Sequence, residues 1–410
     1  MDSKGKAGGK AEAETPGFSV EAGPGALGAA TVTEPAAAVG IAAVGGMTLD
    51  HLQEHYAAIL RARALYYPVA YQFLRELGRG RQGIVFLGLR QGARGCVTRH
   101  AIKLFDPGIY PSAEKYWTDM GRIAMQTSRL QAIRSPNLVA RDVYEEANGI
   151  GYLQMEPIEG VDLRYFLDGK HLDAVKARGR REEWARFADV IFRITEGRMC
   201  IQPGIAIYIM RMMLRGLEVL HSMEFVHSDV KPGNIMIDRL GYVKLVDFGR
   251  AVLMKERPSF LLGTPLYMAP EIHRREPAGA QADIYSVGLV GIEMLRGAPL
   301  ERADLPEEDL LRMKLALPDK LASLVPPYVR RNQEFMAVLR RMLEPDPAKR
   351  FADAGQAESG QDGLLVVHKQ LVKMGQDTEY GRELQNYLGK LLDAPPEQTG
   401  LGGKSERSRS

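Results

Sequence analysis

A short stretch of the chain, residues 221–249, carries polar side chains of a kind that transfer phosphoryl groups. Asp229, Lys231 and Asn234 lie close together, and Asp247 follows after a run of alternating apolar residues. Phosphoryl transfer from a nucleotide needs a carboxylate to orient the attacking hydroxyl and a cation to offset charge on the moving phosphate. Carboxylate and amide oxygens are the ligands that Mg²⁺ prefers. These residue types therefore predict magnesium-dependent phosphoryl transfer.

The flanking sequence indicates how these groups are positioned. The spacing of apolar residues predicts a helix, a loop and two short strands, over residues 203–222, 227–234, 235–237 and 243–246. The turn between the strands is Asp238–Gly241. Because a hairpin returns the chain to the end where it started, Asn234 and Asp247 are expected to lie side by side. The alternative is a buried hairpin whose polar residues only cap its ends.

Two short runs in this stretch resemble the catalytic core of the eukaryotic-type (Hanks-type) serine/threonine protein kinases. They are HSDVKPGN, residues 227–234, and DFG, residues 247–249, with Ser228 where that family usually has Arg. The resemblance implies an α+β, bilobal protein kinase fold with a small, mostly β N-lobe and a large, mostly α C-lobe. It also implies ATP and Mg²⁺ as cofactors and protein Ser or Thr hydroxyls as acceptors. By this resemblance the catalytic residues are Asp229 and Lys231, and the metal ligands are Asn234 and Asp247.

A glycine-rich run, GRGRQG at residues 78–83, lies nearer the N-terminus. A dinucleotide-binding fold would need a helix directly after the third glycine, whereas the residues from Val85 onward predict a second strand. A strand, a loop and a strand are typical of the kinase glycine-rich loop, where missing side chains let backbone amides approach the phosphates. The resemblance assigns the nucleotide contacts to Gly78, Gly80, Gly83, Val85, Ala101, Lys103, Met155, Glu156, Ile158 and Met236.

Two positions in this part of the sequence have alternative interpretations. Lys103 follows the glycine-rich run on an apolar strand, so it either contacts phosphates or extends along the strand to the surface; its place after the loop favours the first. The helix that should supply a glutamate to Lys103 has Gln126 at that place, and a glutamine brings no charge. Glu114 and Asp119 are nearby, but their use would require a different helix register. A kinase-like scaffold with weak catalysis is therefore a second interpretation.

A third motif, GTPLYMAPE at residues 263–271, resembles the end of the kinase activation segment. Small-molecule kinases are not expected to carry it, and together with Lys231 it favours a serine/threonine protein kinase. The family resemblance also implies supporting contacts of Asp283 with the catalytic loop backbone, of Arg350 with Glu271, and of Thr264 with Asp229 and Lys231.

The composition is that of a soluble globular protein. The 410 residues are 45% hydrophobic and 26% charged, and the net charge of +3 is too small to indicate a nucleic-acid partner. Cys96 and Cys200 have no spacing typical of a disulfide framework or a zinc site, and no apolar run is long enough to span a bilayer. We therefore expect a cytoplasmic protein, and the family resemblance implies a signalling enzyme that acts on protein substrates. The oligomeric state is not indicated.

The pattern along the chain and the extent of the family resemblance together predict five parts. These are a disordered tail over 1–46, a helix over 47–70 that begins after Thr48, a protein kinase domain over 71–353, a helical extension over 354–394 and a disordered tail over 395–410. The N-lobe is expected at 71–155 and the C-lobe at 159–353. The charged stretch 169–202 predicts an amphipathic helix with Trp184, Phe187, Val190 and Ile191 facing inward, with a docking site for an acidic partner as the alternative. Two helices of the extension, 364–374 and 379–392, are expected to pack on the large lobe, with partner binding or occlusion of the active site as the alternatives.

Overall fold

The computed structural model describes most of the chain between Met47 and Asp393. The described residues are 47–65, 70–92, 95–195, 197–255, 263–301, 305–373 and 379–393. Both tails that the sequence predicts to be disordered, 1–46 and 395–410, lie outside the described residues.

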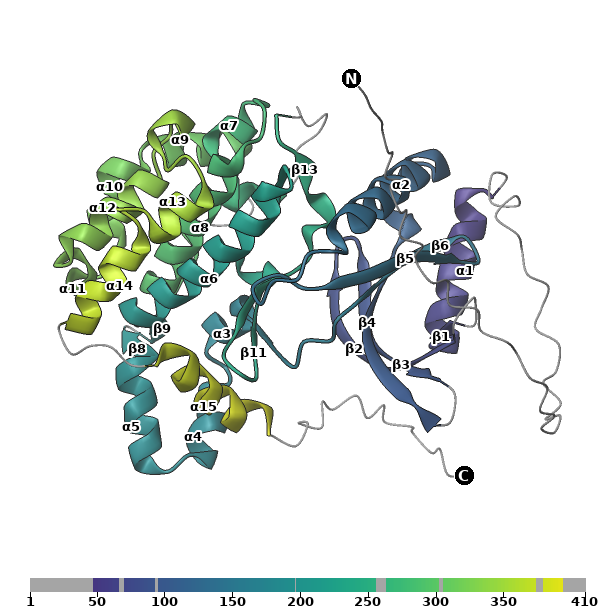
Figure 1. Cartoon of the computed structure of the whole chain (residues 1–410), viewed down its shortest axis with the longest axis horizontal. Helices are drawn as coiled ribbons and strands as arrows, with labels where there is room; N and C mark the ends of the chain where they lie inside the picture. The colour runs from purple at the N-terminus through teal and green to yellow at the C-terminus, as the bar shows by residue number, and fades with distance from the viewer. Residues whose placement is uncertain are drawn as a thin grey trace, which may run out of the picture. The chain divides into compact units, whose positions relative to one another are not determined.

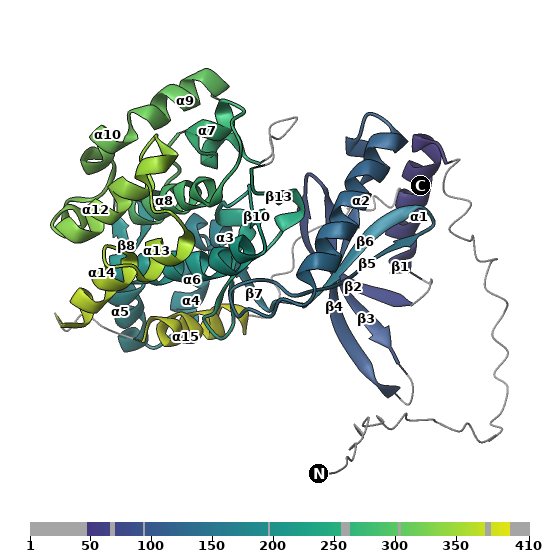
Figure 2. The same ribbon diagram turned by 45° about the horizontal axis from the view of Figure 1, so that its top comes forward.

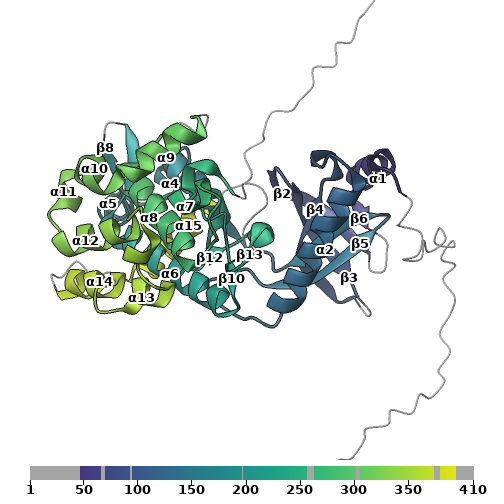
Figure 3. The same ribbon diagram turned by 90° about the horizontal axis from the view of Figure 1, so that it is seen from above.

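The N-lobe is built on one six-stranded sheet with the order β1-β2-β3-β4-β6-β5. Every neighbouring pair in this sheet is antiparallel. Helix α2, Ala113–Leu130, lies along the sheet next to β4 and β5 (Figures 1 and 3) and buries Tyr116, Met120 and Ile123. The strands are β1 Ala64–Leu65, β2 Tyr71–Gly80, β3 Gly83–Gln91, β4 Val97–Phe105, β5 Arg141–Ala147 and β6 Ile150–Met155.

The predicted N-terminal helix is present as α1, Leu49–Ala62, and packs on this lobe. The Thr48 side chain caps it, and Leu52, Tyr56 and Ile59 form its buried face. The helix is shorter than the predicted span of 47–70, and this part of the prediction was wrong. The chain leaves the helix at Arg63, which has a φ of 48° and whose carbonyl accepts a hydrogen bond from Phe73 N at 2.7 Å. This turn redirects the next residues into β1, which pairs with β2.

The C-lobe is organised around two buried helices, α6 Pro203–Ser222 and α8 Ala280–Arg296, which pack against each other (Figures 1 and 2). Helix α6 has the predicted bounds, and all but two residues of α8 are buried. A helix that is apolar on nearly all sides belongs inside a large domain rather than on its surface. Further helices of the lobe are α3 Leu163–Asp168, α7 Pro270–His273, α9 Glu307–Leu315, α10 Leu317–Leu324, α11 Pro327–Arg330 and α12 Gln333–Met342.

The predicted hairpin is confirmed as β11, Ile235–Asp238, and β12, Val243–Leu245. It forms a three-stranded sheet with β7, Gly160–Asp162, in the order β12-β11-β7. Val246 N donates a hydrogen bond to Asn234 O at 2.9 Å, just beyond the hairpin. This bond brings Asn234 next to Asp247, as the sequence predicts. Two further pairs are β8 Phe192–Thr195 with β9 Arg198–Ile201 and β10 Phe225–Val226 with β13 Val252–Leu253.

The charged stretch 169–202 is not one amphipathic helix, so this prediction was wrong in its detail. It forms α4, Leu172–Arg178, then α5, Arg181–Val190, and then the β8–β9 hairpin. Its apolar residues face inward as expected: Phe187 and Ile191 are buried. The C-terminal extension supplies the surface against which they pack.

The extension forms α13 Ala354–Ser359, α14 Leu364–Lys373 and α15 Tyr380–Leu392, and the prediction that it packs on the large lobe is confirmed. Helix α15 lies beside α4 and α5 (Figure 2). The Tyr387 hydroxyl is hydrogen-bonded to His171 Nδ1 at 2.7 Å, and Arg186 pairs with Glu383. In the described part of the chain, none of the helices combines the length and the apolar character that crossing a membrane requires.

Candidate active site

The three central strands of the N-lobe sheet bring four predicted nucleotide contacts to one face. In the sheet register Val85 is opposite Lys103, and Ala101 is opposite Met155. Residues opposite each other share a face, and so do residues two apart on one strand, such as Ala101 and Lys103. Val85, Ala101, Lys103 and Met155 therefore line the same side of the sheet.

The glycine-rich run forms the tight connection between β2 and β3, as predicted. A side chain at Gly83 would lie 1.8 Å from the carbonyl oxygen of Leu104, and its φ of 145° also favours glycine. Gly78 and Gly80 differ, because a Cβ on either would have no neighbour within 4 Å. The first two glycines thus face open space that a phosphate chain can enter, while Gly83 lets β3 approach β4.

The predicted hinge follows β6 at Glu156. Its amide donates to Ala140 O at 3.1 Å, and its carboxylate accepts from Ala140 N at 2.8 Å and from Lys244 Nζ at 3.0 Å. These bonds fix the peptide at the point where it leaves the sheet. Within the described residues, no intramolecular hydrogen bond engages the carbonyl of Glu156 or the amide of Ile158, so both remain for an adenine edge. Met236 is half-buried on β11.

The catalytic loop brings Asp229, Lys231, Asn234 and Thr264 together. Lys231 Nζ lies 2.8 Å from Asp229 Oδ2 and 2.9 Å from the Thr264 hydroxyl, which donates to Asp229 Oδ1 at 3.0 Å. The predicted contacts of Thr264 are therefore confirmed. Asn234 Nδ2 donates to the Asp229 carbonyl at 2.8 Å and to its Oδ2 at 3.1 Å. The Asp229 carboxylate is thus held in place from three sides.

Asn234 and Asp247 fit a hard cation. Because the Asn234 amide nitrogen is directed to Asp229, its amide oxygen remains for a metal. Burial alone would raise the pKa of Asp247, but the charge and hydrogen bond of Lys103 outweigh it and lower that pKa to about 2. An ionised carboxylate and an amide oxygen suit Mg²⁺. The described residues contain no group of three or more His, Cys, Asp or Glu that could hold a metal alone, so phosphate and water oxygens would complete the shell.

Among the described residues, Lys103 does not pair with a helix glutamate, the partner that the family resemblance implies. Its ammonium group contacts Asp247 and donates to Gln82 Oε1 at 3.1 Å. In the described part of the chain, it forms no hydrogen bond or ion pair with Gln126, Glu114 or Asp119. Gln82 was not among the site residues predicted from the sequence. Its position within the glycine-rich run could have indicated that it lies near Lys103.

Helix α2 is attached instead to the backbone that follows Asp247. Gln126 donates to Ala251 O, while Arg122 donates to Gly249 O at 2.9 Å and to Ala251 O at 3.2 Å. Gln126 Oε1 is buried and has no hydrogen-bond partner in the described structure. Arg122 was not predicted to act here, although it precedes Gln126 by one helical turn and so shares its face.

A second residue that the sequence analysis missed is Arg141, at the start of β5. Its guanidinium group lies over the Phe248 ring, 3.8 Å from the ring centroid, and the residue is 3% exposed. Burial lowers the pKa of Arg141 to about 10, so its guanidinium group is still charged at neutral pH. Arg141 therefore supports the residue after Asp247 and places a second positive charge near that carboxylate.

Two predicted supporting contacts are confirmed. The Asp283 carboxylate accepts hydrogen bonds from His227 N at 2.7 Å and from Ser228 N at 3.0 Å. Ser228 has a φ of 65°, an uncommon value for a residue with a side chain, so Asp283 holds the loop in a conformation that the chain alone disfavours. Arg350 binds Glu271 through two bonds, of 2.6 and 2.8 Å.

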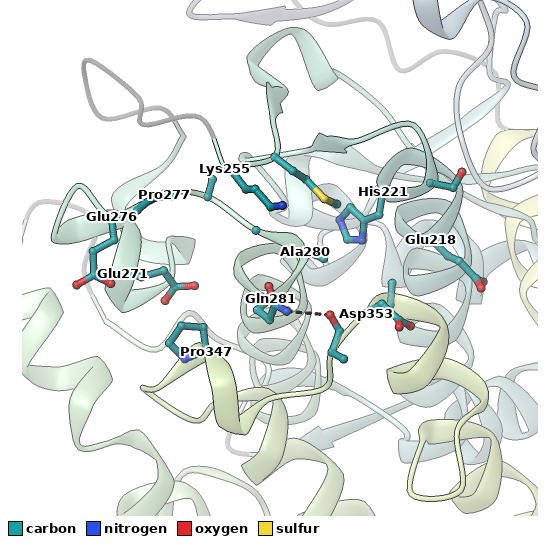
Figure 4. A pocket seen from close by; sticks show the side chains of 16 residues that line it. Glu218, His221, Lys255, Glu271, Glu276, Pro277, Ala280, Gln281, Pro347 and Asp353 are labelled. Atoms are coloured by element: carbon teal, nitrogen blue, oxygen red, sulfur yellow. Dashed lines mark hydrogen bonds between the residues drawn. The ribbon is translucent and has the colours of Figure 1, made fainter.

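A cavity of about 700 Å³ lies between the end of α6 and the starts of α8 and α13 (Figure 4). None of the predicted catalytic, nucleotide or metal residues lines it. Two of its lining residues instead support the site. His221 pairs with Asp283 at 2.9 Å, and Glu271 pairs with Arg350. The cavity is therefore separate from the candidate active site.

Comparisons with known proteins agree with this geometry. Ribosomal protein S6 kinase alpha-6 of Homo sapiens is 25% identical over 324 residues, which cover 78% of this chain and 37% of that protein. Serine/threonine-protein kinase PknH of Mycobacterium tuberculosis is 29% identical over 336 residues, covering 80% of this chain and 46% of that protein. The chain thus spans less than half the length of the curated relatives it matches here.

The fold is also found in a solved structure. A mutant form of the kinase domain of Mycobacterium tuberculosis PknI aligns with a TM-score of 0.50 at 20% identity, covering 74% of this chain and 95% of that one. This likeness supports the bilobal fold that the sheet and helices define. The family model described as the protein kinase domain matches residues 71–359. The chain belongs to the protein kinase family.

Proposed function

We propose that this protein is a serine/threonine protein kinase that transfers the γ-phosphate of ATP to Ser or Thr hydroxyls of proteins. The observation that carries the proposal is the cluster of Asp229, Lys231, Asn234 and Thr264, with Asp247 at the adjacent end of the hairpin. A carboxylate, a cation and two oxygen ligands for a metal are the groups that phosphoryl transfer from a nucleotide requires.

The nucleotide is bound by the sheet face and the glycine-rich loop. Val85, Ala101 and Met236 contact the adenine, and the hinge backbone at Glu156 and Ile158 pairs with its edge. Lys103 and the amides around Gly78 and Gly80 bind the phosphates. Asn234 and Asp247 would hold Mg²⁺, which when bound offsets the charge of the phosphate oxygens.

Asp229 is the group that acts on the acceptor. Its carboxylate orients the incoming hydroxyl and accepts its proton as the oxygen attacks the γ-phosphorus. The bond between the γ-phosphorus and the β,γ-bridging oxygen breaks, and ADP leaves. Lys231 offsets the negative charge that develops on the transferred group. Thr264 keeps the Asp229 carboxylate and the Lys231 ammonium in register, because its hydroxyl bonds to both.

Serine/threonine specificity is supported by Lys231, by the Thr264 contact and by the name of the relative PknH. We further propose that the enzyme is cytoplasmic and acts in signalling on protein partners. Neither Cys96 nor Cys200 forms a disulfide in the described structure, which suits a reducing compartment.

Label transfer from ATP that carries ³²P in its γ-phosphate tests the proposal. The wild-type protein, purified from cells that lack other protein kinases, is expected to label a protein acceptor. Asp229→Asn should bind ATP normally but transfer label at least about a hundredfold more slowly, because only this side chain touches the incoming hydroxyl. Wild-type label transfer by Asp229→Asn would disprove the assignment.

A kinase-like scaffold that binds nucleotide without efficient catalysis is the second candidate function. It is favoured by one observation, the absence of an acidic partner for Lys103 on α2 in the described residues. The same experiment separates the two candidates, because a scaffold would show equally low transfer for the wild type and for Asp229→Asn.

A further inference from the structure

A fully buried lysine, Lys314 on α9, contacts the segment that follows Thr264. Its exposed fraction is 0%. Its ammonium nitrogen lies 2.5 Å from Pro265 O, 2.7 Å from Met268 O and 2.8 Å from His273 Nε2. An ammonium group has three donors, so every donor of Lys314 has a partner. Helix α9 packs on α7 (Figure 1), which carries His273.

The histidine in this network has a defined role. Because an ammonium group only donates, His273 Nε2 must accept, and the ring proton therefore lies on Nδ1. That nitrogen is 3.1 Å from Glu307 Oε1, and Arg275 also binds Glu307 at 3.1 Å. Burial and the Lys314 charge lower the pKa of His273, which agrees with a neutral ring. The network thus runs from the protein surface to two backbone carbonyls.

A buried ammonium group is costly for a fold, because it loses its hydration. Two of the three bonds that compensate for this loss go to carbonyls on either side of Leu266 and Tyr267. Tyr267 is anchored as well: its hydroxyl donates to Glu293 Oε2 at 2.7 Å, and Ser286 Oγ donates to its carbonyl at 2.7 Å. The backbone of residues 265–268 is therefore fixed by side chains from two helices, α8 and α9.

This segment is placed where an acceptor polypeptide must pass. It continues directly from Thr264, whose hydroxyl contacts the Asp229 carboxylate. A Ser or Thr hydroxyl that reaches Asp229 has to bring its flanking residues alongside the chain that leaves Thr264. Among the described contacts of this network, none reaches Lys103, the glycine-rich loop or the hinge, so its influence is confined to the acceptor side of the site.

We propose that Lys314 is a positioning residue for the protein acceptor: it sets the shape of residues 265–268 so that the hydroxyl-bearing chain is aligned with Asp229. The inference rests on the proposed kinase function and deepens it. The proposed role of Lys314 concerns the acceptor and not the binding of ATP. Loss of Lys314 should therefore weaken acceptor recognition and leave nucleotide binding intact.

Lys314→Met tests this role, because methionine fills a similar volume without an ammonium group. Arg312→Met is the matched control, since Arg312 is on the same helix and its side chain is 78% exposed. The acceptor is a peptide selected from a degenerate Ser/Thr library with the wild-type protein. Four quantities are measured for each variant: kcat for the peptide, KM for the peptide, KM for ATP, and the rate of ATP hydrolysis without peptide.

For Lys314→Met we expect kcat/KM for the peptide to fall roughly tenfold or more, mainly through KM, because a small misplacement of an acceptor is amplified in the rate. KM for ATP and peptide-independent hydrolysis should stay within about twofold of wild type. His273→Gln, which retains an acceptor for Lys314, should lose less than His273→Leu. Arg312→Met should match the wild type.

Two results would overturn the inference. One is an unchanged kcat/KM for the peptide in Lys314→Met. The other is an equal loss of peptide transfer and of ATP hydrolysis together with a lower unfolding temperature, which would make Lys314 a stabilising residue of the lobe only. If the wild-type protein transfers no label and hydrolyses no ATP, the proposed kinase function fails, independently of Lys314.

Discussion

The ammonium group of Lys103 binds the carboxylate of Asp247 directly. The proposed phosphate-binding cation and the proposed metal-binding acid are thus paired with each other across the two lobes. Gln126, the residue at the place of the usual helix glutamate, is turned to the Ala251 carbonyl instead. In the part of the chain that the structure describes, the lysine therefore bonds to Asp247, while the helix bonds to the backbone carbonyls of Gly249 and Ala251.

The first prediction concerns the metal. Asp247→Asn should weaken magnesium-dependent ATP binding by roughly tenfold or more, because it removes the ionised ligand. Calorimetric titration with ATP in Mg²⁺ and in EDTA measures the effect. Lys103→Met is the comparison, since it removes the partner but keeps the carboxylate, and it should retain a difference between the two conditions. Equal ATP affinity with and without Mg²⁺ in the wild type would contradict the metal assignment.

The second prediction concerns Gln126. Gln126→Glu should leave the transfer rate unchanged or raise it, because a carboxylate at this position can give Lys103 a charged partner. Steady-state rates and KM for ATP measure the effect. Glu114→Ala and Asp119→Ala are the matched controls and should remain active. If either control eliminates activity while Gln126→Ala has no effect, the assigned register of α2 is wrong.

The third prediction concerns stability. Arg350 and Glu271 form a buried ion pair, with side-chain exposures of 0% and 4%. Arg350→Met should lower the free energy of unfolding by about 3–5 kcal/mol, because it leaves the Glu271 charge buried without its partner. Urea denaturation measures the change. The control is Arg312→Met, which breaks the exposed Arg312–Asp309 pair and should lower the free energy of unfolding by only about 0–1 kcal/mol. Adding Glu271→Gln should restore part of the loss; no recovery in the double variant would argue against charge burial as the cause.

The fourth prediction concerns activation. Ser228 replaces the family's usual arginine, and its hydroxyl bonds only to Val226 O, at 3.3 Å, in the described structure. Because position 228 holds a neutral hydroxyl, it has no positive charge for a phosphate to neutralise. Basal activity should therefore not require phosphorylation. Phosphatase treatment should leave the initial rate unchanged, and so should Ser259→Ala, at a position outside the described residues.

Thr264 and Tyr267, which follow Ser259 in the chain, are poor candidates for an activating phosphate. The Thr264 and Tyr267 hydroxyls are already bonded to Asp229 and Glu293. A collapse of the rate on dephosphorylation that is restored by phosphate on Ser259 would show that another cation, such as Arg250 or Lys255, has the role of the missing arginine.

The fifth prediction concerns pH. Burial lowers the pKa of Lys314 to about 7, far below its ordinary value of 10.5. Between these values the unfolded chain binds more protons than the folded one, so this group makes the free energy of unfolding rise with pH from about 7 to 10. The difference between wild type and Lys314→Met, measured by denaturant titration at several pH values, isolates this rise. A difference that is flat with pH would mean that Lys314 stays charged throughout.

The sequence by itself determined the local elements and the catalytic inventory. The 203–222 helix and the 235–246 hairpin follow from short-range patterns of apolar residues, and a hairpin necessarily returns Asn234 to Asp247. Asp229, Lys231 and Asn234 lie within one short loop, so their contact also follows from short-range sequence. Such features depend on residues near each other in the chain, so they can be read before the fold is known.

Only the tertiary structure decided which distant groups meet. The partner of Lys103, the attachment of Arg122 to Gly249 O, and the burial of Arg141 all depend on how α2 and β5 pack on the chain after Asp247. Lys314 has the same sequence character as an exposed lysine on a helix, and only the packing of α9 on α7 and on residues 265–268 buries it. A charged side chain carries no local signal of its partner, because that partner is chosen by contacts between segments far apart in sequence.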